Sequence, residues 1–508
     1  MAGNRNVISN NTNNGISLSG VGVTRAVIQG NFVGVTPTGN SSMGNTGNGI
    51  QVNNSSDNLI GGTVTGLGNV ISGNGQDGIV FDGNANFNVT QGNLIGTNAA
   101  GTSAIGNSDR GILLKGGSSN NLIGGTTAGA RNIVSGNTNS GIATANVNTS
   151  GNVIQGNYIG TNISGSAALG NKRGLYIQSD GNIIGGAEAG SGNLISGNSM
   201  EGIRLENSKQ NTIQGNLIGT AASGTAALGN GTDGIFLLDS TDTSIGGLVS
   251  TQRNVISGNN NGIYIEKGAD IRVLGNYIGT DILGSADLGN SSNGVSLLNT
   301  NNNLIGGTSP RARNVISGND SNGVLIADGS GNTVQGNFIG TTRTGNAALS
   351  NAQNGISLSN SHSNQIGGTA SGSRNIISGN DLMGVNLIDG SSYNVIEGNH
   401  IGTNVAGTAA VQNDLHGVHL ASASHHNRIG GTSAAARNLM SGNGDNGLFL
   451  TGDDTDYNQV LGNYIGTNAA GTGSISNVNG IYIASGASYN LVGGSTPEAR
   501  NVISGNNK

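Results

Sequence analysis

The chain contains no cysteine, so neither a disulfide bond nor a thiolate metal site can form. Charged residues make up only 9% of its 508 residues, and the net charge is −6. This balance offers no basic surface for nucleic acid and no polybasic patch for a membrane. No apolar run approaches the roughly 20 residues of a membrane span, and the first residues lack the pattern of a signal peptide. We therefore expect no nucleic-acid partner and no membrane span, and we expect any export signal to lie outside this sequence.

Glycine is abundant, with 94 residues, and asparagine recurs at regular intervals. An asparagine, any residue and then an aliphatic residue occur together seventeen times, with gaps that alternate between 22–25 and 36–39 residues. These asparagines are Asn6, Asn31, Asn69, Asn93, Asn132, Asn157, Asn193, Asn216, Asn254, Asn276, Asn314, Asn337, Asn375, Asn399, Asn438, Asn463 and Asn501. A regular period over the whole length indicates one unit that is copied and stacked, so residues 1–508 are expected to form a single solenoid domain.

The repeat resolves into eight copies of about 61–63 residues, each made of two coils. Every coil contains three short segments with the patterns Asn-x-Ile-x-Gly, Asn-x-Ile and Gly-Ile-x-Leu. Apolar and polar residues alternate in these segments, and glycine and asparagine flank them, which is typical of short half-buried strands. Glycine and asparagine are also weak helix formers. We predict an all-β fold, a single-stranded parallel β-helix (β-solenoid) with three strands per coil and about 16 coils.

The recurring asparagines predict a ladder of side-chain amides. Each asparagine opens the second strand of its coil, so we expect it to stack on the asparagine of the next coil and to bind turn backbone groups. The expected ladder comprises Asn31, Asn69, Asn93, Asn132, Asn157, Asn193, Asn216, Asn254, Asn276, Asn314, Asn337, Asn375, Asn399, Asn438 and Asn463.

Residues 151–177 read GNVIQGNYIGTNISGSAALGNKRGLYI. This segment resembles the repeats of the right-handed parallel β-helix superfamily, the pectate-lyase-like and NosD-like proteins, and especially of long bacterial surface proteins. The resemblance covers the whole chain and implies a right-handed solenoid. The superfamily includes lyases, hydrolases, epimerases, adhesins and fibres, so the fold alone does not name the function.

Enzymes of that superfamily gather carboxylates and basic residues in a groove, and the sequence shows no such group. The densest acidic cluster is Asp453, Asp454 and Asp456. Turn formation explains it, and a weak calcium site is the alternative. No coil carries a unique charged insertion. We therefore expect a protein without a catalytic centre and without a cofactor.

Two further columns recur on alternate coils. An arginine precedes the asparagine at most first coils, and we interpret it as capping loop carbonyl groups, with binding of an anionic polymer as the alternative. A second column points outward from the asparagine strand, and a long loop follows it. The loop either packs over these side chains or leaves a stripe on which sugars can stack. The ligand stripe would comprise Phe32, Tyr158, Tyr277, Phe338, His400 and Tyr464.

The sequence begins and stops at the same strand of the same coil type, without a cap at either end. Uncapped solenoid ends expose apolar residues and unpaired backbone groups, so the chain is either a natural or engineered piece of a longer array or a subunit whose ends neighbours cover. In the last case we expect end-to-end, head-to-tail self-association. The end contacts would involve Asn6, Val7, Ile8, Ile16, Leu491, Val502 and Ile503. Our first interpretation is a non-catalytic structural solenoid outside the cell or on its surface: a filament subunit, matrix component or adhesin stalk. A polysaccharide-binding module is the second, and a polysaccharide lyase, hydrolase or epimerase the third.

Overall fold

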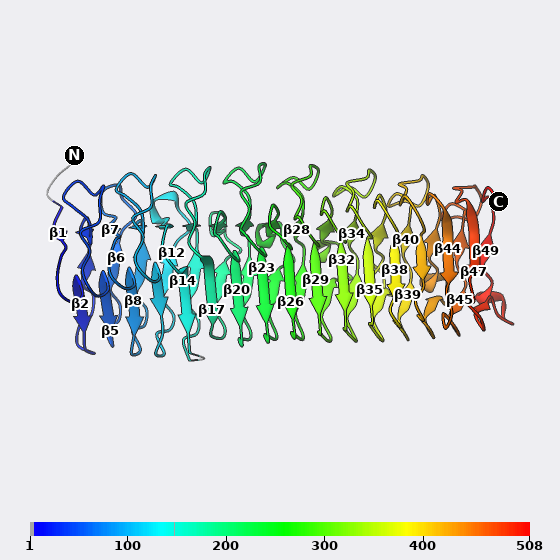
Figure 1. The fold of residues 1–508 in the computed structure, drawn as a ribbon, viewed down its shortest axis with the longest axis horizontal. Coiled ribbons are helices and arrows are strands. Elements are labelled where there is room, and N and C mark those ends of the chain that lie inside the picture. Colours follow the sequence, from blue (N-terminus) through cyan, green and yellow to red (C-terminus); the bar gives the residue numbers. More distant parts are fainter. Residues whose placement is uncertain (1–4, 147) are drawn as a thin grey trace. The chain divides into compact units, whose positions relative to one another are not determined.

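The computed structural model describes residues 5–146 and 148–508. Its chain falls into two compact units, unit 1 (Met1–Asn260) and unit 2 (Asn261–Lys508). In each unit the chain winds into coils, and each coil contributes one strand to each of three parallel sheets (Figure 1). We call them sheet 1, which contains the asparagine strands, sheet 2, which contains the Gly-Ile strands, and sheet 3.

The strands of unit 1 follow the order of the coils. In sheet 1 they are β1 (Val7–Ile8), β4 (Phe32–Val33), β7 (Val70–Ile71), β10 (Leu94–Ile95), β13 (Ile133–Val134), β16 (Tyr158–Ile159), β19 (Leu194–Ile195), β22 (Leu217–Ile218) and β25 (Val255–Ile256). In sheet 2 they are β2 (Ile16–Ser19), β5 (Ile50–Asn53), β8 (Ile79–Asp82), β11 (Ile112–Leu114), β14 (Ser140–Ala145), β17 (Arg173–Gln178), β20 (Ile203–Glu206) and β23 (Ile235–Leu238). In sheet 3 they are β3 (Val27–Ile28), β6 (Leu59–Gly61), β9 (Val89–Gln91), β12 (Leu122–Gly124), β15 (Val153–Gln155), β18 (Ile183–Gly185), β21 (Thr212–Gln214) and β24 (Ser244–Gly246).

Unit 2 repeats the arrangement. Its sheet 1 contains β28 (Tyr277–Ile278), β31 (Val315–Ile316), β34 (Phe338–Ile339), β37 (Ile376–Ile377), β40 (His400–Ile401), β43 (Leu439–Met440), β46 (Tyr464–Ile465) and β49 (Val502–Ile503). Its sheet 2 contains β26 (Ile263–Glu266), β29 (Val295–Leu298), β32 (Val324–Ala327), β35 (Ile356–Ser359), β38 (Val385–Ile388), β41 (Val418–Leu420), β44 (Asn446–Thr451) and β47 (Asn479–Ala484). Its sheet 3 contains β27 (Arg272–Leu274), β30 (Leu304–Gly306), β33 (Thr333–Gln335), β36 (Gln365–Gly367), β39 (Val395–Glu397), β42 (Arg428–Gly430), β45 (Gln459–Leu461) and β48 (Leu491–Val492).

Short 3-10 turns interrupt some loops between sheets 3 and 1. They are Ala128–Ala130 and Ser250–Gln252 in unit 1, and Pro310–Ala312, Ala434–Ala436 and Pro497–Ala499 in unit 2. In the part of the chain that the structure describes, no helix is long and apolar enough to cross a membrane.

The core lies inside the coils and consists of alternate strand residues. In β20, Ile203 and Leu205 point inward and are fully buried, whereas the side chain of Arg204 between them points outward. Strands pair in register with the same strand of the next coil, as Leu175 of β17 does with Ile203. The predicted all-β, right-handed parallel β-helix with three strands per coil is confirmed, with about 15–16 turns in the described residues.

Candidate functional site

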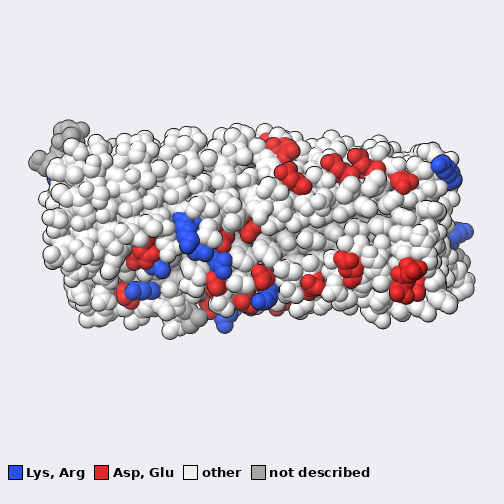
Figure 2. Space-filling view, in the orientation of Figure 1, with Lys and Arg blue, Asp and Glu red and all other residues white. Residues whose placement is uncertain are grey.

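The outer face of sheet 2 in unit 1 carries a dense group of ionisable side chains on strands β17 and β20. β17 and β20 are adjacent parallel strands, and Tyr176 lies opposite Arg204 in their register. Three residues before these positions, Arg173 and Glu201 face each other, and Glu206 lies at the end of β20. We call Arg173, Tyr176, Glu201, Arg204 and Glu206 the Glu201 cluster. Figure 2 shows basic and acidic side chains close together over these strands.

Hydrogen bonds link all members of the Glu201 cluster. Arg173 donates from Nε to Glu201 Oε2 at 2.9 Å, and Arg204 donates from Nη1 to Glu201 Oε1 at 3.0 Å. Arg204 also donates from Nε to Glu206 Oε2 at 3.0 Å. The phenol of Tyr176 donates to the same Glu206 oxygen at 2.7 Å. Such charge-assisted bonds fix the positions of both carboxylates.

Burial and hydrogen bonds act together on Tyr176 and Glu206. Glu201 is only 4% exposed, and both of its oxygens are bound by guanidinium groups. Burial and the hydrogen bond to Glu206 raise the pKa of Tyr176 to about 12. The hydrogen bond from Tyr176 lowers the pKa of Glu206, against the opposing effect of burial. The site therefore holds a protonated phenol against an ionised carboxylate over the whole physiological pH range.

Neighbouring coils extend this face in both directions. Before the cluster, the outward residues Val80, Leu113 and Ala143 form an apolar cluster against which Tyr176 packs. After it, Phe236 of β23 lies under Arg204, with the guanidinium carbon 4.8 Å from the ring centre. Val80, Leu113, Ala143 and Phe236 are 2%, 6%, 2% and 8% exposed, so buried apolar and aromatic side chains flank the cluster on both sides.

A second ion pair lies at the edge of the same face. Arg110 Nη1 is 3.6 Å from Asp77 Oδ1 and 2.6 Å from Asp109 Oδ2. Burial raises the pKa of Asp77, although the backbone N–H of Arg110 donates to it. Asp77, a carboxyl group with a raised pKa, therefore lies beside the outer face of sheet 2.

Sequence reasoning missed the Glu201 cluster. Arg173 and Glu201 are 28 residues apart, and each belongs to a position that varies from coil to coil. The signal was available, because alignment of the Gly174 and Gly202 coils places Arg173 opposite Glu201 and Tyr176 opposite Arg204. Our statement that no carboxylate constellation exists considered single coils, whereas this cluster is assembled from two.

The predicted arginine and ring columns contact each other. Arg313 lies over Phe338 with the guanidinium carbon 4.1 Å from the ring centre, and its Nε donates to Gly336 O at 3.1 Å. The long loop covers the other side, where a Cβ at Gly345 would lie 3.0 Å from Phe338 Cζ. Phe338 is only 2% exposed. Equivalent stacks join Arg5 to Phe32, Arg131 to Tyr158 and Arg437 to Tyr464.

The remaining members of the expected ligand stripe are also covered. Phe32, Tyr277 and His400 are 8%, 5% and 5% exposed, and Tyr158 and Tyr464 are half-buried. Loop glycines Gly284 and Gly407 lie against the rings of Tyr277 and His400. The faces of these rings are therefore used inside the protein, and the structure offers no open stripe for sugars at this column.

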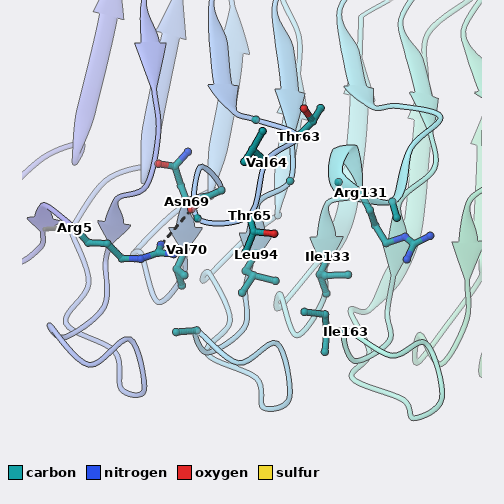
Figure 3. A pocket seen from close by; sticks show the side chains of 17 residues that line it. Arg5, Thr63, Val64, Thr65, Asn69, Val70, Leu94, Arg131, Ile133 and Ile163 are labelled. Atoms are coloured by element: carbon teal, nitrogen blue, oxygen red, sulfur yellow. Dashed lines mark hydrogen bonds between the residues drawn. The ribbon is translucent and has the colours of Figure 1, made fainter. Parts of the chain in front are cut away.

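Arginine and ring occur together in the repeats. Where the arginine is replaced by Gly68 or Gly192, the next coil carries Leu94 or Leu217 in place of a ring. At Gly68 and Leu94 a hollow of about 340 Å³ results, and Arg5 extends into it to donate to Gly68 O at 3.2 Å (Figure 3). None of the described residues that line it is a carboxylate. The hollow therefore lacks a general acid or base, unlike the Glu201 cluster.

The predicted asparagine column forms continuous hydrogen-bonded chains. Asn31 Nδ2 donates to Asn69 Oδ1 at 3.0 Å, and Asn69 Nδ2 donates to Asn93 Oδ1 at 2.9 Å. Backbone N–H groups donate to the same oxygens. Two further columns, through Asn74 and Asn107 and through Asn88 and Asn121, behave alike.

The acidic turn candidates do not form a metal site by themselves. Asp456 Oδ1 accepts hydrogen bonds from Ser488 N at 2.9 Å and Ser488 Oγ at 3.0 Å, and Asp453 and Asp454 are exposed. Among the described residues, no group of three or more histidines, aspartates or glutamates is placed to hold a metal ion.

The residues expected at end contacts belong to the first and last described coils. Val7, Leu491 and Ile503 are 38%, 48% and 45% exposed, and Asn6, Ile8, Ile16 and Val502 are partly or fully exposed. Asn6 Nδ2 donates to Asn31 within its own unit. Head-to-tail association through these residues stays a prediction.

No protein-family model and no curated protein sequence matches the chain. Among solved structures, the A-module of the mannuronan C-5 epimerase AlgE6 from Azotobacter vinelandii is 14% identical, with 90% of this chain and 89% of that chain covered and a TM-score of 0.28. The periplasmic alginate epimerase AlgG is 15% identical, with 79% and 72% covered and a TM-score of 0.34. The DFA-IIIase from Arthrobacter chlorophenolicus A6 is 12% identical, with 84% and 87% covered and a TM-score of 0.32.

These structures share the β-helix fold with the chain, and their names are those of enzymes. The comparison overturns our first interpretation of a non-catalytic structural protein, together with the filament, matrix and adhesin roles that it implied. The sequence analysis considered each coil by itself, so it did not find the Glu201 cluster, whose residues come from two coils.

Proposed function

We propose that this protein is a polysaccharide-modifying enzyme and that the Glu201 cluster is its catalytic centre. The observation that supports this proposal is the mutual contact of two carboxylates, two guanidinium groups and a phenol on the outer face of sheet 2. That face continues over successive coils on either side of the cluster, which suits an extended polymer better than a compact metabolite. Extracellular or cell-surface localisation follows as part of the same proposal, because large polysaccharides are met there.

Arg173 and Arg204 bind the substrate in this proposal. Arg173 uses Nε for Glu201, which leaves its terminal N–H groups for a carboxylate or hydroxyl of the sugar. Glu201 holds both guanidinium groups in place. A fixed pair of cations then orients the polymer and stabilises negative charge that develops during the reaction.

Tyr176 and Glu206 transfer the proton. A sugar oxygen that replaces Glu206 as acceptor receives the proton of the Tyr176 phenol, which is a weak acid like the sugar hydroxyl that leaves. Glu206 stays ionised and acts as the base or as the stabiliser of positive charge on the sugar ring. This acid–base pair serves a lyase, hydrolase or epimerase reaction, and the products distinguish the three.

The test is activity on a panel of acidic and neutral polysaccharides, followed by unsaturated-product absorbance, new reducing ends and NMR of the sugar configuration. Tyr176→Phe and Glu206→Gln should each lower turnover about 100-fold or more, because each removes the proton-transferring group. Tyr264→Phe is the matched control, since Tyr264 also donates to a glutamate two residues later, Glu266, at 3.4 Å. Wild-type rates in both cluster variants, or no turnover on any polymer, would contradict the proposal.

A further inference from the structure

Four consecutive coils of unit 2 place an aromatic ring at the same turn position, just after sheet 2 and before the asparagine that opens sheet 3. We call Tyr393, His426, Tyr457 and Tyr489 the turn-ring ladder. Tyr393 and His426 stack at 5.1 Å and 27°, and His426 and Tyr457 at 5.1 Å and 29°. Tyr457 and Tyr489 stack at 5.3 Å and 8°. The rings form a continuous row, one per coil.

The backbone at this turn position disfavours bulky residues. The four ring residues have φ of 57°, 56°, 54° and 53°, in the left-handed region. Earlier coils of unit 2 place Asp270, Asn302 and Ser363 there, at φ of 57°, 58° and 55°. Small polar residues fit this conformation, whereas an aromatic residue there is an outlier. Tyrosine in this conformation on three of four successive coils indicates a role for the rings beyond forming the turn.

The turn-ring ladder is open to solvent. Tyr393, Tyr457 and Tyr489 are 57%, 50% and 75% exposed, and His426 is also exposed. Because stacking occupies ring faces, the exposed area of these residues includes the ring edges. This is the reverse of the ring column of sheet 1, in which arginines and loops cover the rings. An exposed row of tyrosines is typical of a binding surface.

Two of the four turns that carry the turn-ring ladder also contain carboxylates. Asp389, Asp453, Asp454 and Asp456 belong to the same turns, and the first three are exposed. Asp389 accepts from Ser359 Oγ at 2.7 Å, and Asp456 accepts from Ser488. The turn segments 388–394, 421–427, 451–458 and 484–490 contain no lysine or arginine. Acidic side chains also gather along the edge where sheet 2 strands of unit 2 end (Figure 2).

We propose that the turn-ring ladder binds a glycan that carries protonated amino groups. Carboxylates and phenol oxygens accept hydrogen bonds from ammonium groups, and the excess of negative charge excludes an acidic polymer. One ring per coil gives a row of equally spaced contacts for a repeating chain. The identification of the bound molecule as a glycan rests on the proposed function. The positive charge of the glycan is inferred from the carboxylates of the turns.

The experiment uses the full-length chain and a hexamer of β-1,4-linked glucosamine as the probe. The chain contains no tryptophan, so tyrosine fluorescence and calorimetry both report binding. The double variant Tyr393→Asn, Tyr457→Asn should weaken binding at least tenfold. Its melting temperature should not fall, because asparagine suits the left-handed conformation. Ser363→Tyr adds one ring to the row and should tighten binding.

Phe87→Asn is the matched control. Phe87 occupies the same turn position in unit 1, with φ of 57° and 57% exposure, and it should not affect binding. An equal loss of binding in Phe87→Asn would show that the hexamer does not bind at the turn-ring ladder. Equal binding of the fully N-acetylated hexamer would show that the amino groups play no role. Equally tight binding of oligolysine would show that the site does not select a glycan. Calorimetry measures binding of the hexamer without any turnover, so intact hexamer binding together with no activity on the polysaccharide panel would contradict the proposed function and leave this site standing.

Discussion

His400 is the histidine in the ring column of sheet 1. It is 5% exposed, and burial, with the nearby charge of Arg374, lowers its pKa from 6.5 to about 4. A base with a lowered pKa in the folded state contributes stability above the unfolded value, and that stability is lost as the pH falls from 6.5 through 4.

We predict that His400→Tyr reduces the acid sensitivity of the protein. At about pH 5 the unfolded chain gains a proton at His400 that the folded chain does not, which costs about 2 kcal/mol of unfolding free energy. Tyrosine at this position restores the residue found at Tyr158 and Tyr464. Unfolding by guanidinium at about pH 7.5 and about pH 5 should show a smaller difference for the variant. The same difference in variant and wild type would contradict the lowered pKa.

At the scale of the element, the asparagine columns connect each coil to the next. Asn337 is fully buried, and its Nδ2 donates to Ile305 O at 2.9 Å, Gln335 O at 3.0 Å and Asn375 Oδ1 at 3.1 Å. Its Oδ1 accepts from Asn314 Nδ2 at 2.9 Å. One side chain therefore satisfies buried groups on three coils.

We predict that Asn337→Ala lowers the free energy of unfolding by about 3–5 kcal/mol, because several buried donors and acceptors lose their partner at once. Gln353→Ala is the control, since Gln353 is exposed and should change stability by less than about 0.5 kcal/mol. Chemical unfolding of both variants measures the difference. A loss below about 1 kcal/mol for Asn337→Ala would show that water replaces the amide.

The elements were predictable from the sequence because every coil repeats them. The asparagine position keeps its residue throughout, and inward positions such as those of Ile203 and Leu205 are apolar in nearly every coil, so their environment could be derived from one coil. The ring column was placed outward, but the contact of Arg313 with Phe338 depends on how two coils approach, which alternation within a strand does not reveal. The Glu201 cluster depends on residues that each occur once, and only the register between coils brings them together.

At the scale of the whole molecule, each unit contains its own core. We predict that a protein ending at Asn260 folds by itself, because each coil of a solenoid is stabilised mainly by its neighbours. Circular dichroism should show β structure and cooperative melting for residues 1–260, and residues 261–508 should behave alike. A disordered spectrum would contradict this. That residues 1–508 form a single domain stays a prediction, and two separate calorimetric transitions of the full chain would oppose it.

The asparagine columns also give each unit an electrical direction. Backbone N–H groups can only donate, so the atom that faces Asn31 N and Asn314 N must be the oxygen of the next amide. Every amide in these two columns then points the same way, with its oxygen toward lower-numbered coils and its NH₂ toward higher-numbered ones, whereas the shorter row of Asn293, Asn322 and Asn354 points the other way. Parallel strands contribute little net dipole, whereas aligned amides add up as they do along a helix. A polar polymer that lies parallel to the solenoid axis of a unit would therefore experience different electric fields in its two orientations. The unit can in this way distinguish the two ends of a linear ligand.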